Sequence, residues 1–223
     1  LTDTSSIGNL ISKYKPNEIY NLAAMSHVGI SFYTGEATLN INALSSYRIL
    51  ESILKNHKKC KFYQASSSEM FGSTPPPQNE KSPFNPQSPY GISKVAAFHT
   101  TKYFRQAHGL FASNGILFNH ESPRRGLNFV TRKITHSLAR ILKGYEKKIN
   151  LGDITTRRDW GHSKDYVQGI WKILQQKKPD DYVIATGAQY SIKQFVNKTA
   201  KQLKMKIFWR GKGLKEKAYN EKG

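Results

Sequence analysis

The segment KFYQASSSE, residues 61–69, decides the fold class of this 223-residue chain. Its first five residues have the length and composition of a buried strand, and three consecutive serines follow at once. Similar apolar runs lie on both sides of it in the sequence, EIYNLAA at 18–24 and FASNGILF at 111–118. Between these runs, apolar residues recur at helical spacing in residues 38–56, and a further helix is expected over residues 90–108. Strands that alternate with crossover helices predict a parallel α/β sheet.

The same alternation continues toward both ends of the chain. We predict a helix over residues 7–14 that ends before Pro16, because proline disfavours the helical conformation in the residue before it. We expect residues 1–126 to form a partial, doubly wound, Rossmann-like domain. Residues 127–223 are expected to form a mixed segment that contributes a smaller substrate-binding lobe and late sheet elements. The remaining predicted elements are helices at 128–143, 163–176 and 191–203 and strands at 182–186 and 207–209, with a polar segment, RRDWGH, at 157–162.

Composition limits the class of protein. Lysine and arginine number 35 against 15 aspartates and glutamates, a formal net charge of +20, but the lysines are widely spread and no aromatic-interleaved motif accompanies them. We therefore expect a solvated basic surface and no specific nucleic-acid partner. No apolar run approaches the roughly 20 residues of a membrane helix, so no membrane partner is expected. The single cysteine, Cys60, excludes an internal disulfide and favours a cytoplasmic location, and no metal site is expected.

Polar sequences follow each of the first three predicted strands. NLAAMSH overlaps the end of the first strand, SSSE follows the second and NHESPRRG follows the third. In an open parallel sheet, ligands bind at the carboxyl ends of the strands, near the point where the strand order reverses. The sequence therefore predicts a binding site at this edge of the sheet.

Tyr90 and Lys94 open the predicted helix that follows the SSSE segment. Residues four apart lie on the same face of a helix. A phenol has a pKa of about 10, so a tyrosine that acts as a base near neutral pH needs a shift of roughly three units, or about 4 kcal/mol. An ammonium about 4 Å away supplies energy of that order at an effective dielectric constant of about 20. By spacing alone the pair is more often a solvated helix face, but its position in SPYGISK, after a serine-ended strand, favours a catalytic pair.

Longer strings extend this observation beyond one motif: EIYNLAA, FYQASSSEMFG, SPYGISK, NGILFNHESPRRG, NFVTRKI and LGDITTRRDWGHSKDYV. A Tyr-x-x-x-Lys pair after a strand that ends in serine resembles the extended short-chain dehydrogenase/reductase superfamily. The whole set resembles the GDP-mannose 4,6-dehydratase family, and the resemblance runs from residue 1 to about residue 209.

The resemblance implies a hydro-lyase reaction (EC 4.2.1.47) of GDP-fucose biosynthesis that converts GDP-D-mannose to GDP-4-keto-6-deoxy-D-mannose. Tyr90, with Lys94 beside it, would take the proton of the 4-hydroxyl while hydride passes from C4 to NADP⁺. Glu69 would remove the C5 proton and donate a proton as water leaves C6, and the hydride would return to C6. Ser67 stands where the family commonly has threonine. We expect its hydroxyl to bind the substrate oxygen still, and the activity of the enzyme to be reduced rather than abolished. On residue type alone, Glu69 is also compatible with a surface glutamate that caps a turn.

The resemblance also implies contacts with NADP and with GDP-mannose. Arg125 suits a ribose 2′-phosphate because a guanidinium makes bidentate contacts with phosphate. Lys133 and Arg158 would neutralise the diphosphate, although Lys133 also fits an exposed helix face and His120 fits a core histidine. Ala37 stands where the family tends to place an aromatic residue near the cofactor. The implied cofactor residues are Leu22, Ala23, Ala24, Met25, Ser26, Lys94, His120 and Arg125, and the implied substrate residues are Asn119, Asn128, Val130, Lys133 and Arg158.

Two segments of the family pattern are absent, the glycine-rich G-x-x-G-x-x-G turn and the C-terminal substrate segment. We therefore expect a fragment that binds NADP poorly and aggregates through residues 18–24, which would form an open sheet edge. The alternatives are a truncated, non-catalytic copy and another sugar-nucleotide dehydratase or epimerase. The resemblance further implies a homo-oligomer, a dimer or a tetramer, through residues 123–126.

Overall fold

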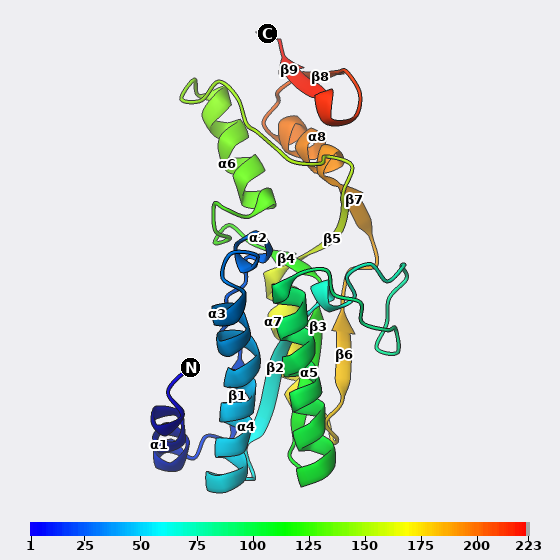
Figure 1. Ribbon diagram of the computed structural model, residues 1–223. Coiled ribbons are helices and arrows are strands. Elements are labelled where there is room, and N and C mark those ends of the chain that lie inside the picture. Colours follow the sequence, from blue (N-terminus) through cyan, green and yellow to red (C-terminus); the bar gives the residue numbers. More distant parts are fainter. Residues whose placement is uncertain (222–223) are drawn as a thin grey trace. The chain divides into compact units, whose positions relative to one another are not determined.

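The computed structural model describes residues 1–221, without the side chain of Leu214 (Figure 1). The chain divides into two compact units. The first unit consists of Leu1–Phe118 and Lys164–Ile184, and the second consists of Asn119–Ser163 and Ala185–Gly223. The assignment of residues 1–126 to a cofactor domain and of residues 127–223 to a substrate lobe stays a prediction.

The first unit contains a four-stranded parallel sheet. Its strands are β1 (Glu18–Asn21), β2 (Lys61–Ser67), β3 (Ala112–Leu117) and β6 (Asp181–Ile184), in the order β1-β2-β3-β6. The predicted parallel α/β fold is therefore confirmed. Strand β2 is two residues longer than its apolar run, because Ser66 and Ser67 pair with Ile116 and Leu117 of β3.

Helices cover both faces of this sheet, as in a doubly wound fold (Figure 1). On one face, α1 (Thr4–Tyr14), α4 (Ser45–Asn56) and α5 (Pro89–His108) enclose a core that includes Phe62. On the other face, α7 (Ser163–Leu174) packs on Tyr63. Phe62 and Tyr63 are consecutive and fully buried on opposite faces, which explains why the strands read as nearly continuous apolar runs.

Helix α5 begins and ends at residues that its sequence specifies. Ser88 is the N-cap, and its hydroxyl accepts a hydrogen bond from the Gly91 backbone N–H at 3.0 Å. Pro89 stands in the first turn, where its missing N–H costs nothing. Gly109 ends the helix with a left-handed φ of 66°. The predicted helix over residues 90–108 is confirmed within one residue.

The predicted helix over residues 38–56 differs from the structure in its first half. Short helix α2 (Val28–Ser31) precedes α3 (Gly35–Leu39), and five residues, Asn40–Leu44, form a π-helical turn before α4 begins. A π-helical turn inserts one residue into the helical repeat and is often found at functional sites. Apolar periodicity did not reveal it, because the apolar residues on both sides keep nearly the same spacing.

The second unit contains shorter elements. Strand β5 (Arg157–His162) pairs in parallel with β4 (Asn119–Glu121) and antiparallel with β7 (Gln189–Ser191). Helices α6 (Val130–Leu142) and α8 (Ile192–Gln202) share an apolar core, and β8 (Ile207–Arg210) and β9 (Lys217–Asn220) form a hairpin. Strands β4, β5, β7 and β9 were not predicted, because none contains the apolar alternation of a half-buried strand.

Within residues 1–221, no helix has both the length and the apolar character needed to cross a lipid bilayer.

Candidate active site

The carboxyl end of β2 and the first turns of α5 hold the four residues predicted to be catalytic. Tyr90 and Lys94 lie in the first two turns of α5 and are both buried, with 8% and 3% of their surfaces exposed. The Lys94 ammonium nitrogen lies 5.7 Å from the centroid of the Tyr90 ring. The four-residue spacing therefore places the two side chains together, as it predicted.

Lys94 is a buried cation with a neutral partner. Its Nζ donates a hydrogen bond to the carbonyl oxygen of Ala65, in β2, at 2.9 Å. No carboxylate among residues 1–221 lies within ion-pair distance of this nitrogen. Burial in a low-dielectric environment disfavours the charged form and lowers the pKa of Lys94 to about 8. The ammonium is thus held by the main chain of β2, beside the phenol.

Ser67 and Glu69 form a tight turn directly after β2. The Ser67 hydroxyl accepts a hydrogen bond from the Glu69 backbone N–H at 3.2 Å and caps the short 3₁₀ helix Ser68–Met70. The turn packs against the first turn of α5 so closely that a Cβ atom on Gly91 would lie 2.8 Å from the Glu69 carbonyl oxygen. The structure therefore brings the Ser67–Glu69 turn and the helix that carries Tyr90 into contact.

The segment after β1 contains the residues implied to contact the cofactor, Leu22 to Ser26. Leu22 is 57% exposed and Ala23 is also exposed, so this strand end presents apolar groups to solvent. The Met25 backbone is held by the Asn42 side chain, whose Oδ1 accepts from Met25 N at 2.8 Å and whose Nδ2 donates to Met25 O at 3.1 Å. Such a segment, small and fixed through its backbone, is compatible with the close approach of a dinucleotide.

Asn42 was not among the predicted site residues. It lies in the π-helical turn, is 1% exposed and also donates to the Ser93 hydroxyl in α5 at 3.0 Å. Its neighbours on the same helical face, Thr38, Ser45 and Ser46, are polar and buried as well, so apolar periodicity gave no signal for it. A buried amide is tolerated only where it finds partners. Asn42 connects the segment after β1 to the helix that carries Tyr90 and Lys94.

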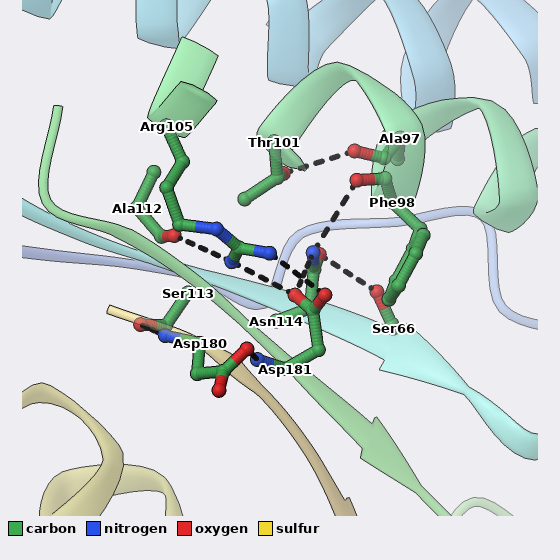
Figure 2. Close-up of polar contacts among 10 residues, drawn as sticks. All are labelled: Ser66, Ala97, Phe98, Thr101, Arg105, Ala112, Ser113, Asn114, Asp180 and Asp181. Atoms are coloured by element: carbon green, nitrogen blue, oxygen red, sulfur yellow. Dashed lines mark hydrogen bonds and ion pairs between the residues drawn. The ribbon is translucent and has the colours of Figure 1, made fainter. Parts of the chain in front are cut away.

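A second cation, Arg105, whose side chain is 12% exposed, fixes the other end of α5 to the sheet (Figure 2). The Arg105 guanidinium makes a bidentate ion pair with Asp181 of β6, at 2.9 and 2.7 Å, and donates to the Ala112 carbonyl at 3.0 Å. Asn114 of β3 donates to Asp181 at 2.8 Å and to the Phe98 carbonyl at 3.3 Å. The Ser66 hydroxyl donates to Asn114 at 3.1 Å, so the network reaches the residue next to Ser67. This network was not predicted, because it joins residues far apart in the chain.

The other predicted site residues belong to the second unit. Arg125 forms an ion pair with Glu121 at 3.3 Å, and its guanidinium lies 3.8 Å from the centroid of the Phe129 ring. Lys133, in α6, donates to the Asn150 carbonyl at 2.6 Å, and Arg158, in β5, donates to the Arg157 carbonyl at 2.9 Å. Asn119 and His120 lie in β4, Asn128 lies just before α6, and Val130 is the first residue of α6. The four catalytic candidates thus lie in one unit and the substrate candidates in the other.

Across residues 1–221, no group of three or more histidine, cysteine, aspartate or glutamate side chains could hold a metal ion.

Fold and site together define an α/β protein of the Rossmann type, with a buried tyrosine–lysine pair at the carboxyl edge of its parallel sheet. The fold is similar to that of RMD from Pseudomonas aeruginosa, solved in complex with NADPH, at a TM-score of 0.84 and 23% sequence identity, over 90% of this chain and 70% of that one. The chain belongs to the GDP-mannose 4,6 dehydratase family, whose model matches residues 1–223.

Curated relatives agree with this assignment. The chain is 48% identical over 221 residues to the GDP-mannose 4,6-dehydratase of Vibrio cholerae, which is 98% of this chain and 59% of the relative. It is 53% identical over 201 residues to GDP-mannose 4,6 dehydratase 1 of Arabidopsis thaliana, which is 88% of this chain and 56% of the relative. The chain therefore spans less than two thirds of the length of these relatives.

Proposed function

We propose that this chain carries GDP-mannose 4,6-dehydratase activity, converting GDP-D-mannose to GDP-4-keto-6-deoxy-D-mannose with loss of water. The observation that supports this most strongly is the buried Tyr90–Lys94 pair, placed against the Ser67–Glu69 turn in a member of this family. Oxidation, elimination and reduction on one sugar require two bases of different strength in one site. A phenol beside an ammonium and a carboxylate on the adjacent turn are such a combination.

Each catalytic candidate has one task in the proposed reaction. Lys94 stabilises the phenolate form of Tyr90 by its positive charge, and this phenolate takes the proton of the sugar 4-hydroxyl and becomes a neutral phenol. A bound nicotinamide supplies a reversible acceptor for the C4 hydride. The 4-keto group makes the C5 hydrogen acidic, so Glu69 removes it and then gives a proton to the departing 6-hydroxyl. The hydride would return to C6 of the resulting unsaturated ketone, and the proton held by Tyr90 would pass to C5, which restores the phenolate. Ser67 donates its hydroxyl hydrogen to the substrate oxygen.

The proposed cofactor is NADP, in contact with Leu22, Ala23, Ala24, Met25, Ser26, Lys94, His120 and Arg125. The NADPH complex of RMD supports a nicotinamide cofactor for this fold. Arg125 supports a 2′-phosphate, since a guanidinium has five N–H donors and the ion pair with Glu121 engages only part of them.

The proposed substrate residues are Asn119, Asn128, Val130, Lys133 and Arg158. Lys133 and Arg158 supply positive charge for a diphosphate. The proposed context is GDP-fucose biosynthesis in the cytoplasm by a homo-oligomer, a dimer or a tetramer, in which residues 123–126 reach a neighbouring subunit.

The test is turnover of GDP-mannose by the purified chain with NADP⁺, followed as formation of the 4-keto-6-deoxy product. Tyr90→Phe is expected to lower the rate roughly 10²–10⁴-fold, the range for loss of a general base. Tyr103→Phe is the matched control, since Tyr103 lies on the same helix and is 48% exposed. Wild-type turnover by Tyr90→Phe would contradict the assignment of the base.

Glu69→Gln separates the two halves of the reaction. Oxidation at C4 does not need Glu69, so this variant should accumulate reduced nicotinamide in proportion to enzyme, without releasing product. UDP-glucose and dTDP-glucose, offered beside GDP-mannose, test the alternative of another sugar-nucleotide dehydratase or epimerase. A folded chain that binds none of these substrates would favour the non-catalytic alternative.

A further inference from the structure

Ser31 contacts the backbone of Tyr90 from a distant part of the sequence. It is the last residue of α2 and only 2% of its surface is exposed. Its hydroxyl accepts a hydrogen bond from the Tyr90 backbone N–H at 3.2 Å and donates to the Val28 carbonyl at 2.7 Å. The first N–H groups of a helix have no partner within the helix, so the Tyr90 N–H depends on an outside acceptor. Ser31 is that acceptor.

The carbonyl of Tyr90 is also bound by a side chain. The Ser93 hydroxyl donates to Tyr90 O at 2.7 Å and receives a hydrogen bond from Asn42 Nδ2. The same Asn42 amide group donates to the Met25 carbonyl. The backbone of Tyr90 is therefore held on its N–H side by Ser31 and on its carbonyl side through Ser93 and Asn42.

Both connections lead to one segment of the chain. Met25 and Ser31 belong to residues 22–31, the segment that follows β1 and includes the proposed cofactor contacts. The Ser88 cap of α5 is local and would form in any helix with this sequence. The Ser31 contact, by contrast, spans 59 residues and forms only when the fold places α2 against α5.

We propose that Ser31 is a positioning residue, which fixes the first turn of α5 to the segment after β1 and so sets the position of the Tyr90 phenol. The inference rests on the proposed role of Tyr90 as the base. Its physical basis is the sensitivity of proton transfer to geometry, since a displacement of about 1 Å can reduce a rate about 10²-fold. A segment that moves when the cofactor binds would move Tyr90 with it.

Hydrogen exchange of the purified full chain, without ligand, tests the contact directly. In Ser31→Ala, the Tyr90 amide should exchange about fivefold faster, the factor that corresponds to one net hydrogen bond. Ser113→Ala is the matched control, because the Ser113 hydroxyl is also buried and also accepts a backbone N–H, that of Asp180, at 3.3 Å (Figure 2). This control should leave the first turn of α5 at the wild-type rate. Unchanged exchange at Tyr90 in Ser31→Ala, or an equal increase across the unit in both variants, would overturn the inference.

Turnover provides a second readout, which a purely structural role would not move. Ser31→Ala should lower kcat about 10–100-fold and change the KM for GDP-mannose less than twofold. Ser31→Thr retains the hydroxyl and should recover most of the lost kcat. Equal kcat in wild type and Ser31→Ala would contradict the proposal. If the wild-type chain has no turnover, the proposed function fails, while the exchange experiment still decides the role of Ser31.

Discussion

Each end of α5 packs a cation against the sheet, and the two cations have opposite surroundings. Near the N-terminal end, Lys94 faces a main-chain carbonyl and the ring of Tyr90. Near the C-terminal end, Arg105 faces the carboxylate of Asp181 in a bidentate ion pair, with the amide of Asn114 beside it. Both cations belong to one helix and lie against one sheet, Lys94 buried and the Arg105 side chain 12% exposed, and they differ most in their partners.

The ion pair between Arg105 and Asp181 stabilises the fold by joining α5 to β6. The Asp181 carboxylate neutralises the charge of Arg105, and three hydrogen bonds hold the guanidinium in place. A buried cation beside a neutral carbonyl keeps its field, and that field acts on the neighbouring phenol. Burial also destabilises the charged form of Lys94, which lowers its pKa. Helix α5 is therefore anchored by an ion pair at one end and carries the proposed catalytic pair at the other.

Removal of the carboxylate should produce the largest effect. Asp181→Ala leaves the largely enclosed Arg105 charge without its carboxylate, and we expect the free energy of unfolding to fall by about 3 kcal/mol, the lower end of the range for a buried pair. Urea denaturation at neutral pH measures this change. Glu51→Ala is the control, because it removes an exposed i,i+4 pair with Lys55 and should cost less than about 1 kcal/mol. Similar losses in the two variants would break the distinction between the anchored end and the end that carries the proposed catalytic pair.

Removal of the lysine should act in the opposite direction and depend on pH. The pKa of Lys94 is about 8 in the folded chain and higher when unfolded, so the unfolded state binds more protons between about pH 8 and 10.5. Folding stability of the wild type should therefore rise with pH in that window, and the cost of the buried charge is fully present below pH 8. Lys94→Met removes this cost and should be more stable at pH 7 by up to about 3 kcal/mol.

The difference between wild type and Lys94→Met should shrink as pH approaches 10.5, where Lys94 is neutral in both states. Unfolding midpoints at pH 7 and at high pH measure it. Lys59→Met, in the exposed turn before β2, should show no such trend. A pH-independent difference in Lys94→Met would mean that Lys94 is not a destabilised cation, and the contrast with Arg105 would be lost.

The smallest expected effect is at Gly91, in the first turn of α5. Gly91→Ala places a methyl group 2.8 Å from the Glu69 carbonyl and 2.9 Å from Pro86 Cβ, so the turn and the helix must separate. Overpacking of this kind costs about 1–3 kcal/mol. We also expect turnover to fall, since Tyr90 and Glu69 move apart. Ala107→Gly, on the exposed face of α5, is the control and should not affect turnover. Gly109→Ala is unsuitable as a control, because Gly109 has a left-handed φ of 66°.

Much of the fold was predictable from local patterns. Alternating apolar runs and helical spacing indicated the parallel sheet, and Ser88, Pro89 and Gly109 specify the limits of α5. The Tyr90–Lys94 pair was predictable because a four-residue spacing on a helix determines proximity. Strands β4, β5 and β7 were not, because they are short and polar and exist only through pairing with one another.

The residues that hold the site in place required the tertiary structure. Ser31, Asn42 and Arg105 act on partners far away in the sequence, and nothing in a serine, an asparagine or an arginine indicates which backbone or carboxylate it will meet. The sequence alone determined the fold class, the family resemblance and the candidate chemical groups, because these depend on residue type and local spacing. The tertiary structure decided that Lys94 faces a carbonyl and Arg105 a carboxylate, because the partner of a buried charge depends on which strands the sheet brings together.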